Sequence, residues 1–157
     1  MIAIALYQPD IPQNTGNILR LGACLGASVH IIEPAGFDMS DRALRRAGMD
    51  YIAAVDLRRH TGWAAFVSWR ESRRIILLTT HADVAYADFT FRDDDVLLFG
   101  RESAGVPEEI HAAADARLLI PMRSGLRSLN VAAAAAMVLG EALRQTGGFP
   151  VTTRGPE

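Results

Sequence analysis

Short, continuous apolar runs rich in β-branched residues recur along this sequence, and most are separated by segments with helical periodicity. The apolar runs cover residues 2–6, 29–32, 75–78, 96–99 and 118–120. The helical patterns cover residues 15–25, 40–47, 61–70, a short stretch after Pro107, and residues 128–145. Apolar strands that alternate with helices are typical of a parallel sheet covered on both faces. We therefore predict an α/β fold with a mostly parallel sheet.

Local signals between these segments predict one domain that spans residues 1–157. Ser40 is typical of a helix N-cap, Gly48 and Gly147 of helix ends, and Pro107 of a first helical residue. Residues 52–57 are a candidate for an additional strand. The chain has no internal repeat, linker or low-complexity tract, and its 50% hydrophobic content is enough for one core.

The composition excludes several classes of protein. No run approaches the roughly 20 apolar residues of a membrane span, and the first residues lack the basic flank of a signal peptide. Cys24 is the single cysteine, which excludes an internal disulfide and fits a reducing compartment, so we expect a cytoplasmic protein. There is no lysine, which excludes a phosphate-loop lysine and a pyridoxal Schiff base.

The charge balance limits how the chain could bind nucleic acid. All 16 basic residues are arginines, and the net charge is −2, so a generic polyanion binder is not expected. Any contact with nucleic acid must come from local arginine clusters. These clusters are Arg42, Arg45 and Arg46, then Arg58 and Arg59, and then Arg73 and Arg74. Each is by default a solvated helix face or strand end.

Polar residues follow three of the predicted strands, where ligands bind in open α/β sheets. The first segment, QPDIPQNTGNILR, covers residues 8–20 and contains Asn14. At helical spacing Asn17, Arg20 and Cys24 share one face of the helix that follows. An ordinary helix cap with an exposed arginine explains this segment equally well.

The second segment, LLFGRESAGVPEEI, covers residues 97–110. Gly100 ends the apolar strand, and Gly105 closes a tight loop around Glu102, so a ligand could approach the backbone closely. The alternative is a structural turn in which Glu102 caps the helix after Pro107. Neither a dinucleotide fingerprint nor a nucleophile elbow is present, because Ser103 lacks the flanking glycines.

The third segment, IPMRSGLRSLNVAAAAAMVLGEAL, covers residues 120–143 and runs from a strand into an almost wholly apolar helix. Arg127, Ser128 and Asn130 lie where the first turn of that helix presents unpaired backbone N–H groups. Such a helix start attracts anions. Ser128 could equally be an N-cap and nothing more.

Other polar and aromatic residues carry weaker signals. The four histidines, His30, His60, His81 and His111, lack metal-ligand spacing, so no metal is expected. Residues 93–95 are three aspartates that indicate a polar turn, with a divalent ion as the alternative. Trp63 and Trp69 are expected to pack against the core of the protein.

Together the three segments resemble, in order and spacing, the three signature motifs of the SPOUT methyltransferases. The first motif is similar to residues 14–20, NTGNILR, and the second, G-x-E-x-x-G, to residues 100–105, GRESAG. The third is similar to residues 120–122, IPM, continued by SLN at residues 128–130. Residues 8–17 and the IIEP of residues 31–34 also resemble the branch that methylates the tRNA wobble position. That branch has a proline and a basic residue where this chain has Arg101 and Ala104.

The resemblance implies a fold and an activity. The fold is an α/β knot, in which the C-terminal segment forms a deep trefoil knot. The activity is transfer of a methyl group from S-adenosyl-L-methionine to the ribose 2′-OH of nucleotide 34, a cytidine or 5-carboxymethylaminomethyluridine, in leucine tRNAs. The implied partners are the tRNA anticodon stem-loop and a second copy of the chain, with neither a metal nor a membrane.

The resemblance also implies roles for particular residues. The implied catalytic residues are Arg20, Asn14, Glu102, Ser128 and Asn130. The implied contacts with S-adenosyl-L-methionine are Leu78, Gly100, Gly105, Ile120, Met122, Ser128 and Leu129. The arginine of the first motif is often assigned as a base, but a guanidinium stays charged at neutral pH and then has no acceptor atom. We interpret Arg20 as a residue that holds a phosphate and stabilises the developing alkoxide, at the cofactor site of the partner subunit.

Two other functions fit parts of the same pattern. The same transfer could act at another tRNA or rRNA position. A non-catalytic RNA-binding α/β module is an alternative from a different class, although such a module need not retain Asn14, Arg20, Glu102, Ser128 and Asn130 together.

Overall fold

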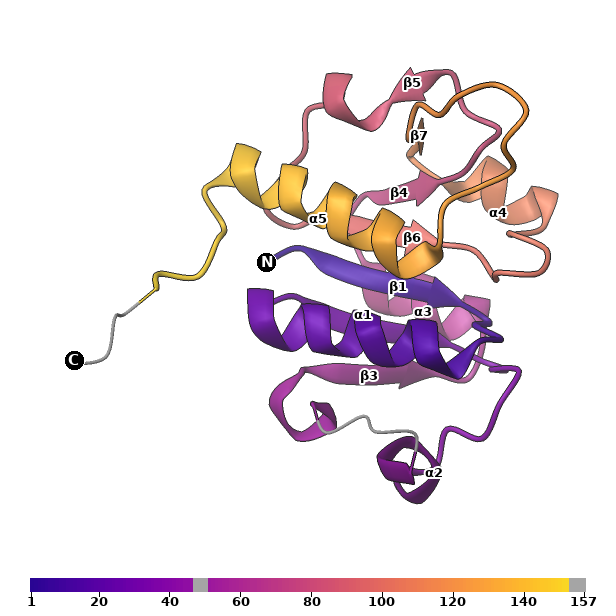
Figure 1. Ribbon diagram of the computed structural model, residues 1–157, viewed down its shortest axis with the longest axis vertical. Helices are drawn as coiled ribbons and strands as arrows, with labels where there is room; N and C mark the ends of the chain where they lie inside the picture. The colour runs from indigo at the N-terminus through magenta and orange to yellow at the C-terminus, as the bar shows by residue number, and fades with distance from the viewer. Residues whose placement is uncertain (47–50, 153–157) are drawn as a thin grey trace.

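The computed structural model describes residues 1–46 and 51–152 of the chain. In this part of the chain seven strands form one sheet in the order β3-β2-β1-β6-β4-β7-β5, and neighbouring strands are parallel (Figure 1). The strands are β1 (Ala3–Tyr7), β2 (Ser28–Ile32), β3 (Leu57–His60), β4 (Ile75–Leu78), β5 (Val84–Ala85), β6 (Val96–Phe99) and β7 (Ala116–Leu119). The predicted parallel α/β sheet is confirmed.

Helices cover both faces of this sheet. Helices α1 and α5 lie side by side on one face (Figure 1), whereas α3 and α4 bring Phe66 and Ile110 to the core on the other face. The helices are α1 (Pro12–Leu25), α2 (Asp41–Arg46), α3 (Trp63–Arg70), α4 (Glu108–Ala113) and α5 (Val131–Thr146), with short 3₁₀ turns at Ile52–Ala54 and Tyr86–Asp88. None of the described helices is long and apolar enough to cross a membrane.

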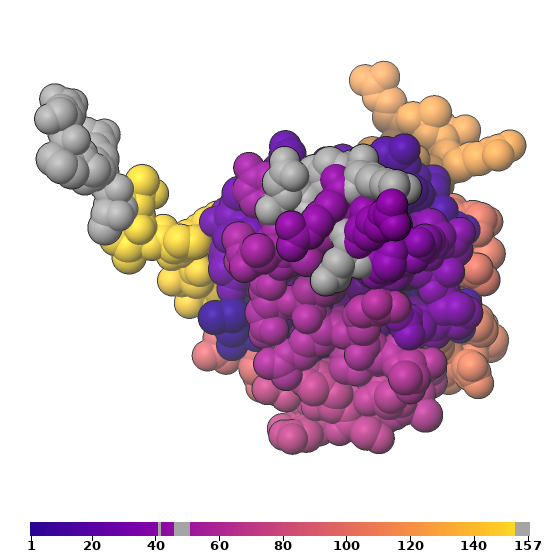
Figure 2. Space-filling view, turned by 90° about the horizontal axis from the view of Figure 1, so that it is seen from below, coloured from indigo at the N-terminus to yellow at the C-terminus, as the bar shows by residue number. Residues whose placement is uncertain are grey.

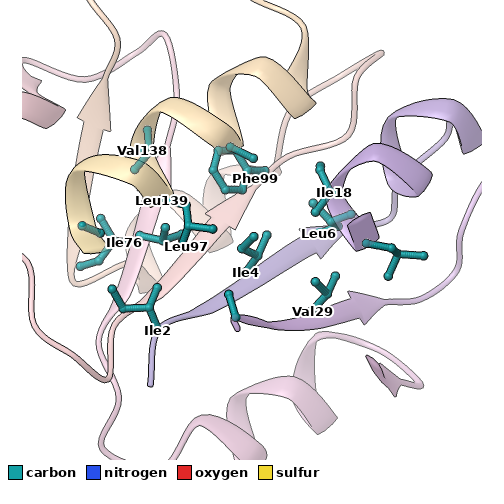
Figure 3. Close-up of a cluster of buried hydrophobic side chains, with 14 of the residues drawn as sticks. Ile2, Ile4, Leu6, Ile18, Val29, Ile76, Leu97, Phe99, Val138 and Leu139 are labelled. Atoms are coloured by element: carbon teal, nitrogen blue, oxygen red, sulfur yellow. The ribbon is translucent and has the colours of Figure 1, made fainter. Parts of the chain in front are cut away.

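The central strands bury side chains on both faces, which is why they are continuously apolar. All five residues of β1 are buried. Ile4 points toward α1 and α5, where it packs in a cluster with Leu97 and Leu139 (Figure 3). Ala5 belongs to the cluster on the opposite face, as the two-residue period of a strand requires.

Two of the four predicted helix ends agree with the structure. Ser40 Oγ accepts the backbone N–H of Ala43 (3.2 Å), and Gly147 ends α5 in the left-handed conformation at φ 65°. The predicted helix end at Gly48 lies outside the described residues. Pro107 occupies the N-cap position of α4 and not the first helical position, so that prediction is off by one residue.

Two other sequence predictions need correction. Residues 52–57 were expected to form a strand, but they contain a 3₁₀ turn, and the strand begins at Leu57. Helix α1 begins at Pro12 and not near Thr15, because the fixed φ of a proline suits the first turn of a helix.

The aspartates at residues 93–95 form a turn held by an ion pair. Asp95 is buried, and its carboxylate binds Arg74 at 2.7 Å and accepts the backbone N–H of Arg92 at 2.8 Å. The predicted polar turn is therefore confirmed. Trp63 and Trp69 pack against the core cluster beneath α3, also as predicted.

The strand order brings together the loops that carry the three motifs. Strand β6 lies between β1 and β4, and β7 lies beside β4, so their carboxyl ends meet at one edge of the sheet. The segment between β7 and α5, orange in Figure 2, stands out from the body of the molecule. Its Leu126 is 67% exposed.

Candidate active site

A pocket of about 590 Å³ opens at the carboxyl ends of β4, β6 and β7. Its walls come from the start of α1, the turn after β6, and the segment that joins β7 to α5. Apolar side chains, including Leu78, Ile120 and Leu129, share these walls with polar groups. A concave, partly apolar pocket with a few convergent polar groups is the usual form of a small-molecule site.

A chain of hydrogen bonds joins the three motif segments along this pocket. Asn130 Nδ2 donates to Asn14 Oδ1 at 2.8 Å, and Asn14 Nδ2 donates to Glu102 Oε1 at 3.4 Å. The other oxygen of Glu102 accepts the backbone N–H of Asp10 at 3.0 Å. Residues that lie as many as 116 positions apart in the sequence thus share one network.

The start of helix α5 fixes the direction of this chain. Asn130 is the N-cap, and its Oδ1 accepts the backbone N–H groups of Ala132 (2.9 Å) and Ala133 (3.2 Å). Its amide nitrogen must therefore face Asn14, and the amide nitrogen of Asn14 must face Glu102. The network delivers donors to Glu102, so this carboxylate is held in place as an acceptor. The N-cap is Asn130 and not Ser128, the alternative considered from the sequence.

Glu102 and Asp10 differ in how readily they take up a proton. Burial raises the pKa of Glu102, and a side-chain hydrogen bond with Asp10 raises it further. The same bond, followed by one from the hydroxyl of Ser103, lowers the pKa of Asp10. Burial and the shared hydrogen bond thus shift the two pKa values in opposite directions.

A tight turn after β6 carries Glu102 into the pocket. The backbones of Arg101 and Gly105 pair with each other through bonds of 3.0 and 2.8 Å, and Gly105 has a φ of 64° that favours glycine. A Cβ at Gly100 would lie 2.6 Å from the carbonyl carbon of Gly105, so a side chain there would force the two backbones apart. Glu102 does not cap α4, which excludes the alternative considered from the sequence.

The structure brings the predicted site residues together with one exception. The residues that line the pocket are Asn14, Leu78, Gly100, Glu102, Gly105, Ile120, Met122, Ser128, Leu129 and Asn130. Arg20 is exposed on α1 and is not part of the pocket wall of its own chain. Its guanidinium lies 4.8 Å from the centre of the Tyr51 ring.

Sequence reasoning missed several polar residues of the site. Asp10 lies within the first motif segment, but its bond to Glu102 depends on the pairing of β1 with β6, which no local signal encodes. His81 and His111 both line the pocket with ring centres 6.4 Å apart. In residues 1–46 and 51–152, no group of three or more His, Cys, Asp or Glu side chains is arranged to hold a metal ion.

Relatives of known name resemble this chain along almost its whole length. It is 65% identical over 146 residues to a tRNA (cytidine(34)-2′-O)-methyltransferase of Beijerinckia indica, which covers 92% of this chain and 91% of the relative. It is 43% identical over 149 residues to the protein of the same name in Escherichia coli K12, which covers 94% and 95% of the two chains.

Solved structures share the fold. One from work on the 2-OH methylation of C/U34 on tRNA superposes with a TM-score of 0.86 at 44% identity, covering 92% of this chain and 95% of that one. The SpoU methyltransferase AviRb of Streptomyces viridochromogenes, in complex with AdoMet, superposes with a TM-score of 0.82 at 28% identity, covering 91% and 57%. The model of the SpoU rRNA Methylase family matches residues 1–140. The chain, with its pocket at the carboxyl edge of a parallel sheet, belongs to the SpoU rRNA Methylase family.

Proposed function

We propose that this protein transfers a methyl group from S-adenosyl-L-methionine to the ribose 2′-OH of nucleotide 34, a cytidine or 5-carboxymethylaminomethyluridine, in leucine tRNAs. The observation that carries this proposal is the hydrogen-bond chain from Asn130 through Asn14 to Glu102 at the edge of the pocket. The relatives named tRNA (cytidine(34)-2′-O)-methyltransferase support the choice of substrate.

The pocket fits the methyl donor in size and in chemistry. About 590 Å³ lies within the range of small-molecule sites. We assign Leu78, Ile120, Met122 and Leu129 to the apolar surface around the adenosine. The backbone at Gly100 and Gly105 and the hydroxyl of Ser128 supply polar contacts. The donor contributes a sulfonium methyl group, which is electrophilic.

The polar chain is suited to orienting the ribose hydroxyl for attack. Transfer between two bound groups depends largely on alignment, so fixed side chains beside the hydroxyl account for much of the rate. Asn14, Asn130 and Ser128 hold the ribose, and Glu102 is the acceptor toward which the network points. A hydroxyl is a weak nucleophile until it shares its proton with such an acceptor.

Arg20 contributes from a second copy of the chain. A guanidinium stays charged and has no acceptor, so its role is to bind the phosphate beside the ribose and to stabilise negative charge on the oxygen. A two-fold dimer through α1 and α5 would bring Arg20 of one subunit to the pocket of the other. Ile11, the N-cap of α1, and Met137 of α5 are each 41% exposed, which supports an apolar contact there.

The remaining partners follow from the substrate. The anticodon stem-loop enters at the open side of the pocket, where the segment from β7 to α5 stands out from the molecule (Figure 2). We place the protein in the cytoplasm, where tRNA is modified, and assign it neither a metal nor a membrane partner. The trefoil knot implied by the motifs remains part of this proposal.

The direct test is to incubate the purified protein with labelled methyl donor and total tRNA from cells that lack wobble 2′-O-methylation. Mass spectrometry of nuclease digests should locate the label on the ribose of nucleotide 34 in leucine tRNAs. Glu102→Ala, which removes the acceptor of the hydrogen-bond chain, serves as the control and should give no label there. A label at a different nucleotide, or on rRNA alone, would contradict the proposed substrate.

A further inference from the structure

Arg101 carries a buried donor that no other described residue accepts. Its Nε is buried and has no hydrogen-bond partner among the described residues, although the side chain lines the pocket. Leaving a buried charged donor unpaired costs its desolvation free energy. Nearly all buried polar groups in native structures have a partner, so an unpaired donor in a pocket needs an explanation, and a bound ion is one.

The turn that holds Arg101 lies at the border of the pocket. The backbone of Arg101 is paired with Gly105, so the base of the side chain is fixed. Residues Ser103, Ala104 and Gly105 on the same turn are exposed, which places the turn at the border with solvent. Any group that reaches Arg101 therefore comes from the open side of the site.

Asp10 lies within electrostatic reach of Arg101. The positive charge of Arg101 contributes to the lowered pKa of Asp10, after the larger effects of hydrogen bonds with Glu102 and Ser103. Asp10 Oδ1 is buried and has no hydrogen-bond partner among the described residues. An arginine has five N–H donors, so a contact with one carboxylate oxygen leaves donors free for a second anion.

We propose that Arg101 binds a backbone phosphate next to the nucleotide that is methylated, and that this phosphate is distinct from the one assigned to Arg20 of the second copy. The inference rests on the proposed function and adds to it the residue that holds the RNA backbone at the pocket mouth. A guanidinium matches the two oxygens of a phosphate in a planar fork. A chain with a net charge of −2 and no lysine must hold RNA through local arginines, and Arg101 lies beside Glu102 at the reacting end of the site.

Binding of an anticodon stem-loop RNA at several salt concentrations tests this assignment. Arg101→Gln keeps most of the side-chain length but removes the charge. We expect it to weaken RNA binding and to raise the KM for tRNA about tenfold or more. The slope of log binding constant against log salt should fall in magnitude by about 0.7 to 1, the value of one phosphate contact. Arg101→Lys should keep the slope and lose part of the affinity, because lysine lacks the planar fork.

Arg92→Gln is the matched control, because Arg92 is exposed at the amino end of β6, away from the pocket. It should leave the KM and the salt slope unchanged. Arg101 could bind either the RNA phosphate or the carboxylate of the methyl donor. Calorimetry with S-adenosylhomocysteine distinguishes these two anions. A weaker affinity of Arg101→Gln for this compound would assign the guanidinium to the carboxylate of the donor and overturn the proposal.

If the KM for tRNA and the salt slope of Arg101→Gln matched those of the wild type, Arg101 would interact with Asp10 alone. This result would also overturn the proposal. The melting temperature of Arg101→Gln should match that of the wild type, and Arg101→Lys provides a second variant if it does not. Failure of the proposed function can be distinguished from failure of the Arg101 assignment. In the first case the wild-type protein itself would place no methyl group on nucleotide 34.

Discussion

At the residue scale, the side chain of Asn130 has two structural roles. Its amide oxygen caps α5, and its amide nitrogen holds Asn14, so the start of the helix and the polar chain depend on the same group. The motif resemblance identified Asn130 as a site residue. The cap could not be distinguished from Ser128 by sequence, because both residue types favour N-cap positions. The bond to Asn14 could not be predicted either, since it joins loops that only the strand order brings together.

A buried pair of histidines predicts how stability depends on pH. His30 Nδ1 and His60 Nε2 are 2.9 Å apart, and His30 has no exposed surface. Burial, followed by the charge of His60, lowers the pKa of His30 to about 3, and burial also lowers the pKa of His60. Between about pH 6.5 and pH 3 the unfolded chain therefore binds more protons than the native protein, and stability falls as the pH falls.

Urea unfolding at pH 7.5 and at pH 5.5 measures this effect. His30 alone should lower the free energy of unfolding by about 1–2 kcal/mol across that interval, because its unfolded pKa of about 6.5 lies inside it. His30→Gln should reduce the difference between the two pH values, whatever it does to the stability at pH 7.5. Equal stability of the wild type at both pH values would contradict the prediction.

At the scale of elements, strands could be predicted from the sequence where burial on both faces requires apolar residues. The runs at 75–78 and 96–99 coincide with β4 and β6, which are buried on both sides by helices. Strand β3 was missed because it is an edge strand, and its exposed Arg58 and Arg59 conceal the apolar pattern. Strand β5 has only two residues and is defined by its pairing with β7 alone.

The turn after β6 yields a prediction about its first glycine. Gly100→Ala places a Cβ against the backbone of Gly105, so the turn must open and move Glu102. We expect a loss of about 1–3 kcal/mol in stability and at least a tenfold weaker binding of S-adenosylhomocysteine. Thermal unfolding and calorimetry give the two values.

Gly62→Ala provides the control for that experiment. A Cβ at Gly62 meets no atom within 4 Å, and its backbone is extended, so the substitution should change neither value by much. If Gly100→Ala bound S-adenosylhomocysteine as tightly as the wild type, the close packing of the turn would not be important for the pocket.

At the scale of the molecule, the proposed site is shared between two chains. Arg20 lies outside the pocket wall of its own chain, whereas Glu102 lines that wall. Arg20→Ala and Glu102→Ala should each abolish methylation when assayed alone. After the two inactive proteins are unfolded and refolded together, random pairing should restore about one quarter of the wild-type sites, because each mixed dimer contains one intact site. Transfer assays before and after mixing measure the recovery.

Two controls make the mixing experiment decisive. Arg20→Ala should retain its affinity for S-adenosylhomocysteine, since Arg20 does not line the pocket of its own chain. Each variant refolded by itself should stay inactive. If the mixture also stays inactive while mass measurements show mixed dimers, then Arg20 acts within its own chain, and the shared site is wrong.

The molecule as a whole was predictable only in part from the residues themselves. Alternating strands and helices indicated the parallel sheet, but the order of its strands depends on contacts between distant segments. The convergence of Asn14, Glu102 and Asn130 came from the resemblance of the motifs and not from periodicity. The trefoil knot stays a prediction, because neither periodicity nor spacing encodes a threaded chain.

The fixed direction of the hydrogen-bond chain has a consequence for when the protein can act. The amide of Asn130 is oriented by the first turn of α5, and the orientation of Asn14 depends on Asn130. A nascent polypeptide that has not yet released its last helix from the ribosome lacks this orienting group. The carboxylate at position 102 then lacks the amide chain that orients it, so competence for modifying RNA requires that α5 has left the ribosome and folded.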